Sequence, residues 1–180
     1  MNKLIESVTQ LLTIVPRPPG TAIPGPASTG DLNAFRQSIG YEIPPDLRDW
    51  LNISNGPCVG PGGLFGIGLL PKHLSIDHHL SLYPEWGERR WLPIAGDGSG
   101  NYYLLAASEE FGGGHPIVFV EPIVDKFKPI YVAASNIWSF LDFLLRRELN
   151  QSKWPFDQAE VLACDPDILT VVGVSLPWEA

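Results

Sequence analysis

Three oxygen-bearing side chains, Asp97, Ser99 and Asn101, alternate with glycine in one short segment. Such alternation is typical of the first half of a calcium loop, which also needs glycine at its sixth position and a bidentate glutamate at its twelfth. Counted from Asp97, those positions hold Tyr102 and Ser108. The segment therefore predicts a tight turn in which Asp and Asn bond to nearby backbone, rather than a complete calcium loop.

A small ligand or a metal ion is the alternative use of this polar turn. Asp97, Ser99 and Asn101 would supply oxygen ligands, and His115 would join them from a later loop. Because a ligand site combines a pocket with convergent polar groups, this hypothesis requires the fold to bring His115 to the turn. We predict no cofactor.

A second set of candidate metal ligands lies close together in the chain. His73 and Asp77 are four residues apart and could share a helix face, with His78 or His79 as a further ligand. Adjacent side chains diverge on a helix or a strand, so His78 and His79 cannot readily bind one ion. We interpret the segment as a polar loop and predict no metal site there.

No arrangement of nucleophile and base points to catalysis. Ser99 lies in a predicted hairpin and not in a Gly-x-Ser-x-Gly turn between strand and helix. Cys58 and Cys164 are far apart, without metal-ligand spacing, and are interpreted as buried or idle thiols. The run 112–114 is three glycines, but it lacks the Lys and Ser/Thr of a P-loop and precedes a strand, which favours a flexible hairpin loop. We therefore predict that the protein is not an enzyme.

Composition and charge restrict the partners. The 180 residues carry a formal net charge of −8, from 20 acidic and 12 basic side chains. Direct nucleic-acid binding is disfavoured, because phosphate contacts need concentrated Lys and Arg. No segment approaches the roughly 20 apolar residues of a membrane span, and the N-terminus does not resemble a signal peptide. We expect one domain in the cytoplasm.

The hydrophobic spacing predicts helices first, strands in the middle and a helix near the end. Helical periodicity covers residues 3–15, 28–39 and 44–53, and a later helix capped by Ser135. Branched and aromatic runs predict strands, at Gly62–Ile67, Trp91–Ala95, Asn101–Ala107, Pro116–Val120 and Pro129–Val132. Residues 71–83 are expected to form a loop with one helical turn. Strands in close succession imply an antiparallel meander of about four to six strands, covered by the C-terminal helix, in an α+β domain.

The order of these pieces resembles the SUKH superfamily, which includes a fungal regulator of cell-wall synthesis and many bacterial immunity proteins. The resemblance covers about residues 25–149, and the series of segments is more specific than any one alone. The matching segments, in chain order, are Ile43–Leu47 with Trp50 and Leu51, Ser54–Gly56, Leu64–Gly66, Trp91–Asn101, Pro116–Phe119, and Ser135 with Phe140 and Leu141.

This resemblance implies a non-enzymatic α+β protein-binding domain over residues 1–150. Bacterial relatives are commonly encoded beside toxins, often nucleases, and neutralise them by direct binding. An acidic protein can occupy the basic groove with which a nuclease binds phosphates. We expect an immunity-type protein with a cognate toxin as its protein partner; the oligomeric state stays open.

The family positions are interpreted as parts of the scaffold. We expect the large apolar side chains among them in the core and the glycines in turns. These positions are Trp50, Asn55, Gly56, Leu64, Phe65, Trp91, Gly98, Gly100 and Phe140.

Residues 151–180 form an acidic extension that is expected to pack on the same domain, since its apolar residues are too many for a disordered tail. Packing would leave four acids on the surface as a charged ridge. That ridge is the preferred contact for a basic partner and consists of Asp157, Glu160, Asp165 and Asp167.

Overall fold

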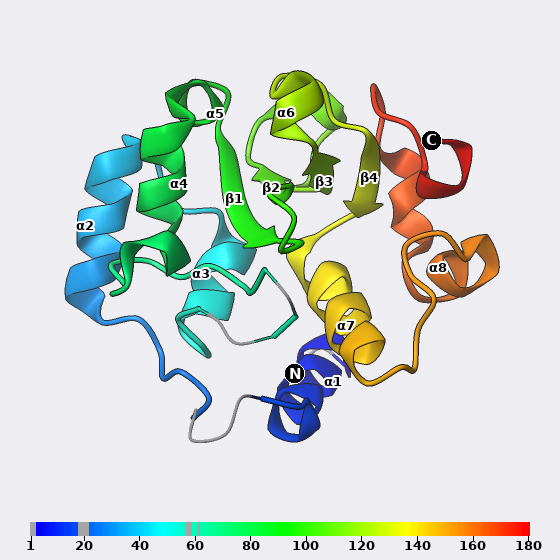
Figure 1. Ribbon diagram of the computed structural model, residues 1–180, viewed down its shortest axis with the longest axis horizontal. Coiled ribbons are helices and arrows are strands. Elements are labelled where there is room, and N and C mark those ends of the chain that lie inside the picture. The colour runs from blue at the N-terminus through cyan, green and yellow to red at the C-terminus, as the bar shows by residue number, and fades with distance from the viewer. Residues whose placement is uncertain (1–2, 18–21, 57–58, 61) are drawn as a thin grey trace.

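A computed structural model describes residues 3–17, 22–56, 59–60 and 62–180 (Figure 1). The interpretation of Cys58 as a buried or idle thiol falls outside these ranges. Of the two alternatives, Cys164 is not buried but is an exposed free thiol. In the described part of the chain, no helix combines the length and the apolar character needed to cross a membrane.

The elements follow the predicted order of helices, strands and helices. The helices are α1 (Lys3–Ile14), α2 (Thr29–Ile39), α3 (Pro45–Leu51), α4 (Ile76–Leu82), α5 (Pro84–Glu88), α6 (Pro122–Asp125), α7 (Ile137–Glu148) and α8 (Gln158–Cys164). The strands are β1 (Trp91–Gly96), β2 (Tyr102–Ala106), β3 (Ile117–Val120) and β4 (Tyr131–Ala134). Short 3₁₀ turns add η1 (Lys72–Leu74), η2 (Glu109–Phe111), η3 (Pro166–Thr170) and η4 (Pro177–Glu179).

The four strands form an antiparallel meander in the order β1-β2-β3-β4. This confirms the α+β class, with the strand number at the low end of the predicted range. The strand expected at Gly62–Ile67 was wrong, because only isolated bridges join Leu64 to Ala95 and Gly66 to Ser75. Glycine at four of the positions 62–68, two of them at positive φ, interrupts the extended run.

Both faces of this sheet are buried. One face joins the main core, to which α7 contributes Phe140 and Leu141. The other face packs on Trp86 from α5, on Phe111 from η2 and on Val174 from the tail. Every residue of β3 and β4 is buried, because neither face meets solvent. Trp91 belongs to the second face; Trp50, Leu64, Phe65 and Phe140 belong to the main core.

The start of α7 differs from the expectation of a Ser135 cap. The Asn136 side chain accepts hydrogen bonds from the backbone N–H groups of Trp138 (2.9 Å) and Ser139 (3.0 Å), and so caps the helix. Ser135 instead donates its backbone N–H to the Asp165 carboxylate at 2.7 Å, and its hydroxyl donates to the same group. Asp165 is therefore 3% exposed, and its expected place on a surface ridge was wrong.

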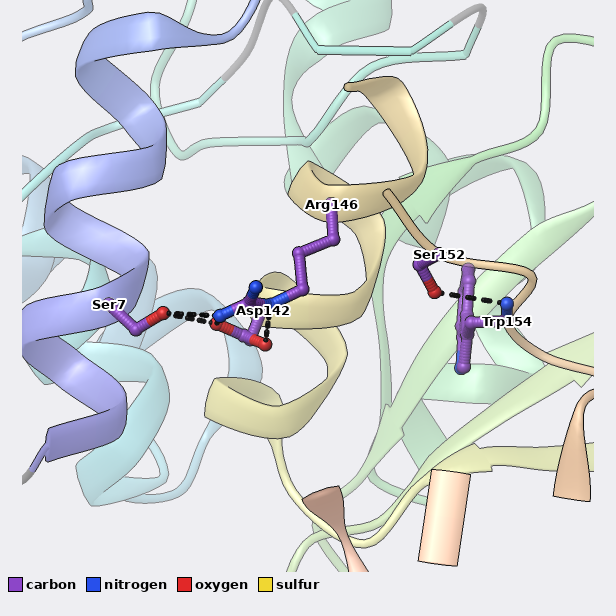
Figure 2. Close-up of polar contacts among 5 residues, drawn as sticks. All are labelled: Ser7, Asp142, Arg146, Ser152 and Trp154. Carbon is purple, nitrogen blue, oxygen red and sulfur yellow. Dashed lines mark hydrogen bonds and ion pairs between the residues drawn. The ribbon is translucent and has the colours of Figure 1, made fainter. Parts of the chain in front are cut away.

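A polar cluster fastens α1 to α7 (Figure 2). Ser7 Oγ donates to Asp142 at 2.6 Å, and Arg146 donates through Nε to the same carboxylate at 2.6 Å. Arg146 Nη2 also donates to Ser7 Oγ at 3.0 Å. Hydrogen bonding to Asp142 raises the pKa of Arg146. The Asp142 carboxylate is buried, so its two partners offset the cost of desolvating its charge.

Residues 71–83 are more helical than expected. They form η1 and α4, because Ile76, His79 and Leu80 lie at helical spacing and face inward. His79 is 7% exposed and stacks on Phe65 with ring centroids 4.0 Å apart. The helical spacing was missed in the sequence because histidine is usually counted as polar, whereas His79 packs in the core as an aromatic residue.

Trp154 joins the tail to the rest of the fold. Its indole N–H donates to the Ala133 carbonyl of β4 at 2.8 Å, and its ring stacks on Phe143 of α7 at 6.0 Å. Its backbone N–H donates to Ser152 Oγ at 3.0 Å (Figure 2). The side chain is 2% exposed, so the tail lies against both β4 and α7.

Replacement of Trp154 by alanine should lower the free energy of unfolding by about 3–5 kcal/mol, because a large buried ring is lost and a cavity remains. Phe156→Ala is the matched control: this aromatic ring of the same segment is 61% exposed, and its loss should cost about 1 kcal/mol or less. Urea denaturation followed by tryptophan fluorescence and circular dichroism measures both. Equal costs for the two variants would contradict the structural role of Trp154.

Candidate functional site

A groove of about 550 Å³ lies between α2 and α4, which run side by side at one end of the molecule (Figure 1). Ala34, Phe35 and Ser38 of α2 line one wall, and Asp77 and Ser81 of α4 line the other. The loop 68–70 also lines the groove. The groove is open to solvent and mixes an apolar lining with polar groups, which is typical of a protein-docking surface.

A buried asparagine positions the segment that leads into this loop. Asn55 donates through Nδ2 to the Ile67 carbonyl at 3.0 Å and accepts from the Ile67 backbone N–H at 2.8 Å. Gly66 passes so close that a Cβ there would lie 2.5 Å from Asn55 Oδ1. The Asn55 side chain therefore makes the two backbone hydrogen bonds with Ile67 that a neighbouring strand would otherwise make. These bonds fix the position of Gly68 and the residues after it, which line the groove.

Gly68 and Leu70 then shape the rim. Gly68 adopts φ +62°, and a Cβ there would approach Asp31 Oδ1 to 3.0 Å, so glycine allows the loop to approach α2 closely. Leu70 is 84% exposed. A leucine presented so fully to solvent beside a groove is a ready contact for an apolar partner surface.

Two carboxylates, one from each wall, give the groove negative charge. Asp77 accepts hydrogen bonds from Ser75 Oγ at 2.9 Å, from Ser38 Oγ at 3.3 Å and from the Gly68 backbone N–H at 3.4 Å. Asp31 belongs to the capping box of α2 with Ser28. Neither carboxylate forms an ion pair with a described Lys, Arg or His side chain, so both charges remain available to a cation. Lys72 and His78 also line the groove.

A second hollow of about 320 Å³ continues the groove toward α5. The two spaces share Ser38, Asp77 and Ser81, and the second adds Leu80 and Pro84. Together they form a trough along α2, and grooves of this kind take up an extended segment or a helix of another protein.

The hairpin turn at 97–101 satisfies its own polar groups. Asp97 accepts from the backbone N–H of Ser99 at 2.7 Å and of Asn101 at 3.1 Å, and from Asn101 Nδ2 at 2.8 Å. Gly98 and Gly100 both have positive φ, as a turn of this kind requires. The carboxylate thus organises the turn.

His115 does not lie at this turn. It lies two residues before Ile117, the first residue of β3, which pairs with Leu105 near the end of β2. Asp97 and Asn101 lie at the opposite end of β1 and β2. His115 lines a hollow with Arg90 and Tyr41 instead. The four-residue ligand set expected from the sequence is therefore not brought together.

The remaining acids of the expected ridge have mixed surroundings. Asp157 caps α8 by accepting from the Glu160 backbone N–H at 3.1 Å, and Glu160 accepts from the Lys153 backbone N–H at 3.0 Å. Both are partly buried, and Asp167 is exposed. A role for Asp157, Glu160 and Asp167 in partner binding stays a prediction. Helix α8, which Asp157 caps and which contains Glu160, lies on the side of the molecule opposite α2 (Figure 1).

The histidines of α4 are arranged for structure. His79 Nε2 lies 2.9 Å from the His73 carbonyl and Nδ1 lies 3.2 Å from the Tyr102 hydroxyl. A neutral ring that donates through Nε2 and accepts at Nδ1 satisfies both contacts. Among the residues that the structure describes, no group of three or more His, Cys, Asp or Glu side chains could hold a metal ion.

The groove itself escaped sequence reasoning. Its two walls are distant in the chain, and α4 was expected to be mostly loop. The available signal was the spacing of Ile76, His79 and Leu80 after Ser75, which is the spacing of a short amphipathic helix.

Comparison with known proteins defines the class. The chain belongs to the SMI1/KNR4 family (SUKH-1), whose family model matches residues 26–142. This family is known generally for immunity and regulator-type proteins and is generally not catalytic. No curated protein matches the chain. The groove walls and the hairpin lie within the matched residues, whereas α1, α8 and the tail lie outside them.

The pKa of His79 gives a prediction for stability. Burial lowers this pKa, and His78 and His73 lower it further, against the opposing effect of the bond to the His73 carbonyl. Below about pH 6.5, the ordinary value of the unfolded chain, unfolding therefore takes up a proton. The contribution of His79 to the free energy of unfolding should be constant above about pH 7 and should fall as the pH drops below about 6.5.

His79→Phe keeps a ring in the core and removes the titration. Urea denaturation at pH 7.5 and 5.5 should show a smaller loss of stability on acidification for this variant than for the natural protein. His115→Gln serves as the control and should retain the natural pH dependence. An unchanged pH dependence in His79→Phe would contradict the assignment.

Proposed function

We propose that this protein is a non-enzymatic, immunity-type protein that acts in the cytoplasm and neutralises a toxin by direct stoichiometric binding. Membership of the SMI1/KNR4 family supports this proposal, since that family is known for immunity and regulator-type proteins. The observation that carries it is the trough along α2, with its apolar lining, the exposed Leu70 and two carboxylates without ion-pair partners among the described residues.

The chemistry of the trough selects the kind of partner surface. An apolar side chain of the partner enters beside Phe35 and Leu70, and a Lys or Arg beside it meets Asp31 and Asp77. Apolar anchors at the centre of an interface provide most of the binding energy, and surrounding charges provide orientation and speed of encounter.

A basic toxin, such as a nuclease, is the class of partner that the charge favours. The net charge of −8 attracts a positively charged protein over distances of about 10 Å at moderate salt. Nucleases bind phosphates with concentrated Lys and Arg, so an acidic protein bound at that surface excludes the substrate. No catalytic step is required of this chain.

Blocking the trough tests the proposal. Ala34 is an exposed residue of α2 that lines the groove, so Ala34→Trp fills the space without disturbing the core. Binding to the toxin encoded by the neighbouring gene should weaken at least about tenfold, which is about 1.4 kcal/mol. Isothermal titration calorimetry measures the dissociation constant and the 1:1 stoichiometry, and a toxicity assay in cells measures neutralisation.

Ala163→Trp is the matched control, because Ala163 is also an exposed helical alanine but lies on α8 beside the acidic tail. This variant should bind like the natural protein. Loss of binding in Ala163→Trp alone would move the contact to Asp157, Glu160 and Asp167. If the natural protein binds neither this toxin nor any other protein that co-purifies with it, the proposed function is wrong.

A further inference from the structure

A second cleft lies at the end of the sheet where β1 begins and β2 ends. Two adjoining hollows of about 330 and 380 Å³ share Arg90, Ala107 and His115. The first hollow adds Tyr41 and Arg48, and the second adds the glycine loop that precedes His115. This cleft has no residue in common with the trough along α2.

Arg90 is held in place by unusual backbone geometry. It has φ +57°, a left-handed conformation that costs free energy for a residue other than glycine. Its N–H donates to the Gly87 carbonyl at 3.1 Å, and its carbonyl accepts from the Ala107 N–H at 2.8 Å. The guanidinium lies 5.1 Å from the centroid of the Tyr41 ring. Such strain is found preferentially at functional sites, where it fixes the position of a group.

Two hydroxyl groups at this cleft lack partners. Tyr41 Oη and Ser108 Oγ are buried atoms without a hydrogen-bond partner among the described residues, and each residue lines one of the two hollows. An unpaired buried hydroxyl destabilises the fold, so a partner that comes from outside the chain would recover this free energy. Burial raises the pKa of Tyr41 to about 12, which keeps its proton available for donation at neutral pH.

The charges of the cleft favour an anion. Neither Arg48 nor Arg90 forms an ion pair with a described carboxylate. Two acidic residues, Glu42 and Glu109, line the cleft. Glu42 forms an ion pair with Arg36 at 3.0 Å, which offsets its negative charge. An excess of unpaired guanidinium groups is unexpected in a chain with a net charge of −8, and planar guanidinium groups match phosphate oxygens well.

The glycine loop lets a ligand approach the backbone. Gly113 and Gly114 have φ of +91° and +70°, and a Cβ added to either would meet no atom closer than 3.9 Å. The loop therefore presents bare main chain at the edge of the cleft. A ligand can approach such a main chain closely, because no Cβ stands in its way.

We propose that this cleft binds a small phosphate-bearing anion through Arg48, Arg90 and the hydroxyl groups of Tyr41 and Ser108. The shared chemistry is a tetrahedral phosphate, either free or as the phosphomonoester of a small metabolite. A phosphate supplies enough acceptor oxygens for both hydroxyl donors and both guanidinium groups, and its double negative charge exceeds that of a single carboxylate. This site is independent of the proposed toxin contact, since it lies outside the trough.

Calorimetric titration of the full chain with inorganic phosphate and with ribose 5-phosphate tests the site, and free ribose is the uncharged control. Both phosphates should bind with 1:1 stoichiometry, and ribose should give no heat. Tighter binding of ribose 5-phosphate would assign the site to a metabolite, and equal binding would assign it to free phosphate. No binding of either phosphate would overturn the proposal.

Two variants with matched controls separate the site from general charge effects. Arg48→Gln should weaken phosphate binding about 10- to 100-fold, whereas Lys128→Gln, which removes an exposed positive charge outside the cleft, should leave it unchanged. Tyr41→Phe should weaken binding about tenfold without lowering the melting temperature of the unliganded protein, because it removes an unpaired hydroxyl. Equal losses in Arg48→Gln and Lys128→Gln would show that phosphate binds by charge alone and would overturn the assigned site.

Discussion

The burial of the sheet on both faces is the constraint on which the other elements depend. Four short strands bury too little apolar surface among themselves to be stable alone, so other elements must pack on the faces of the sheet. On one face, α7 provides that cover, and on the other face Trp86, Phe111 and the tail provide it. The short α4–α5 unit must therefore end with Trp86 under the sheet, which places α4 beside α2. The trough is a consequence of how the second face is covered.

The sequence predicts elements whose signal is local. Strands β1 to β3 follow from branched and aromatic runs around glycine-rich turns, and α7 follows from apolar residues at helical spacing. What it misses depends on residues distant in the chain. Asp165 was expected to be exposed, but it binds Ser135, which lies 30 residues earlier in the chain. His79 was expected in a polar loop, but its ring packs against Phe65 and Tyr102. The trough and the basic cleft are assembled from several segments each, so no single pattern could have located them.

The two carboxylates of the trough and the two arginines of the basic cleft lie in different parts of the molecule. The carboxylates lie along α2 and α4, and the arginines, which form no ion pair with a described carboxylate, lie just before β1 and on α3. This separation favours a basic partner at the trough, because like charges across an interface cost free energy, although Lys72 also lines the trough. The basic cleft then needs a use of its own, and its unpaired hydroxyls point to a ligand that a protein partner would not supply.

The contact between Ser7 and Asp142 has a consequence for how the chain folds during synthesis. The two residues are 135 positions apart in the chain. Because ribosomes add about 5–20 residues per second, roughly 7 to 27 s pass between the synthesis of Ser7 and that of Asp142. Throughout that interval the apolar side chains Val8, Leu11 and Leu12 lack the helix on which they finally pack. The nascent chain is therefore most prone to aggregation while its first helix is complete and unpaired, and docking of α1 is expected among the last steps of folding.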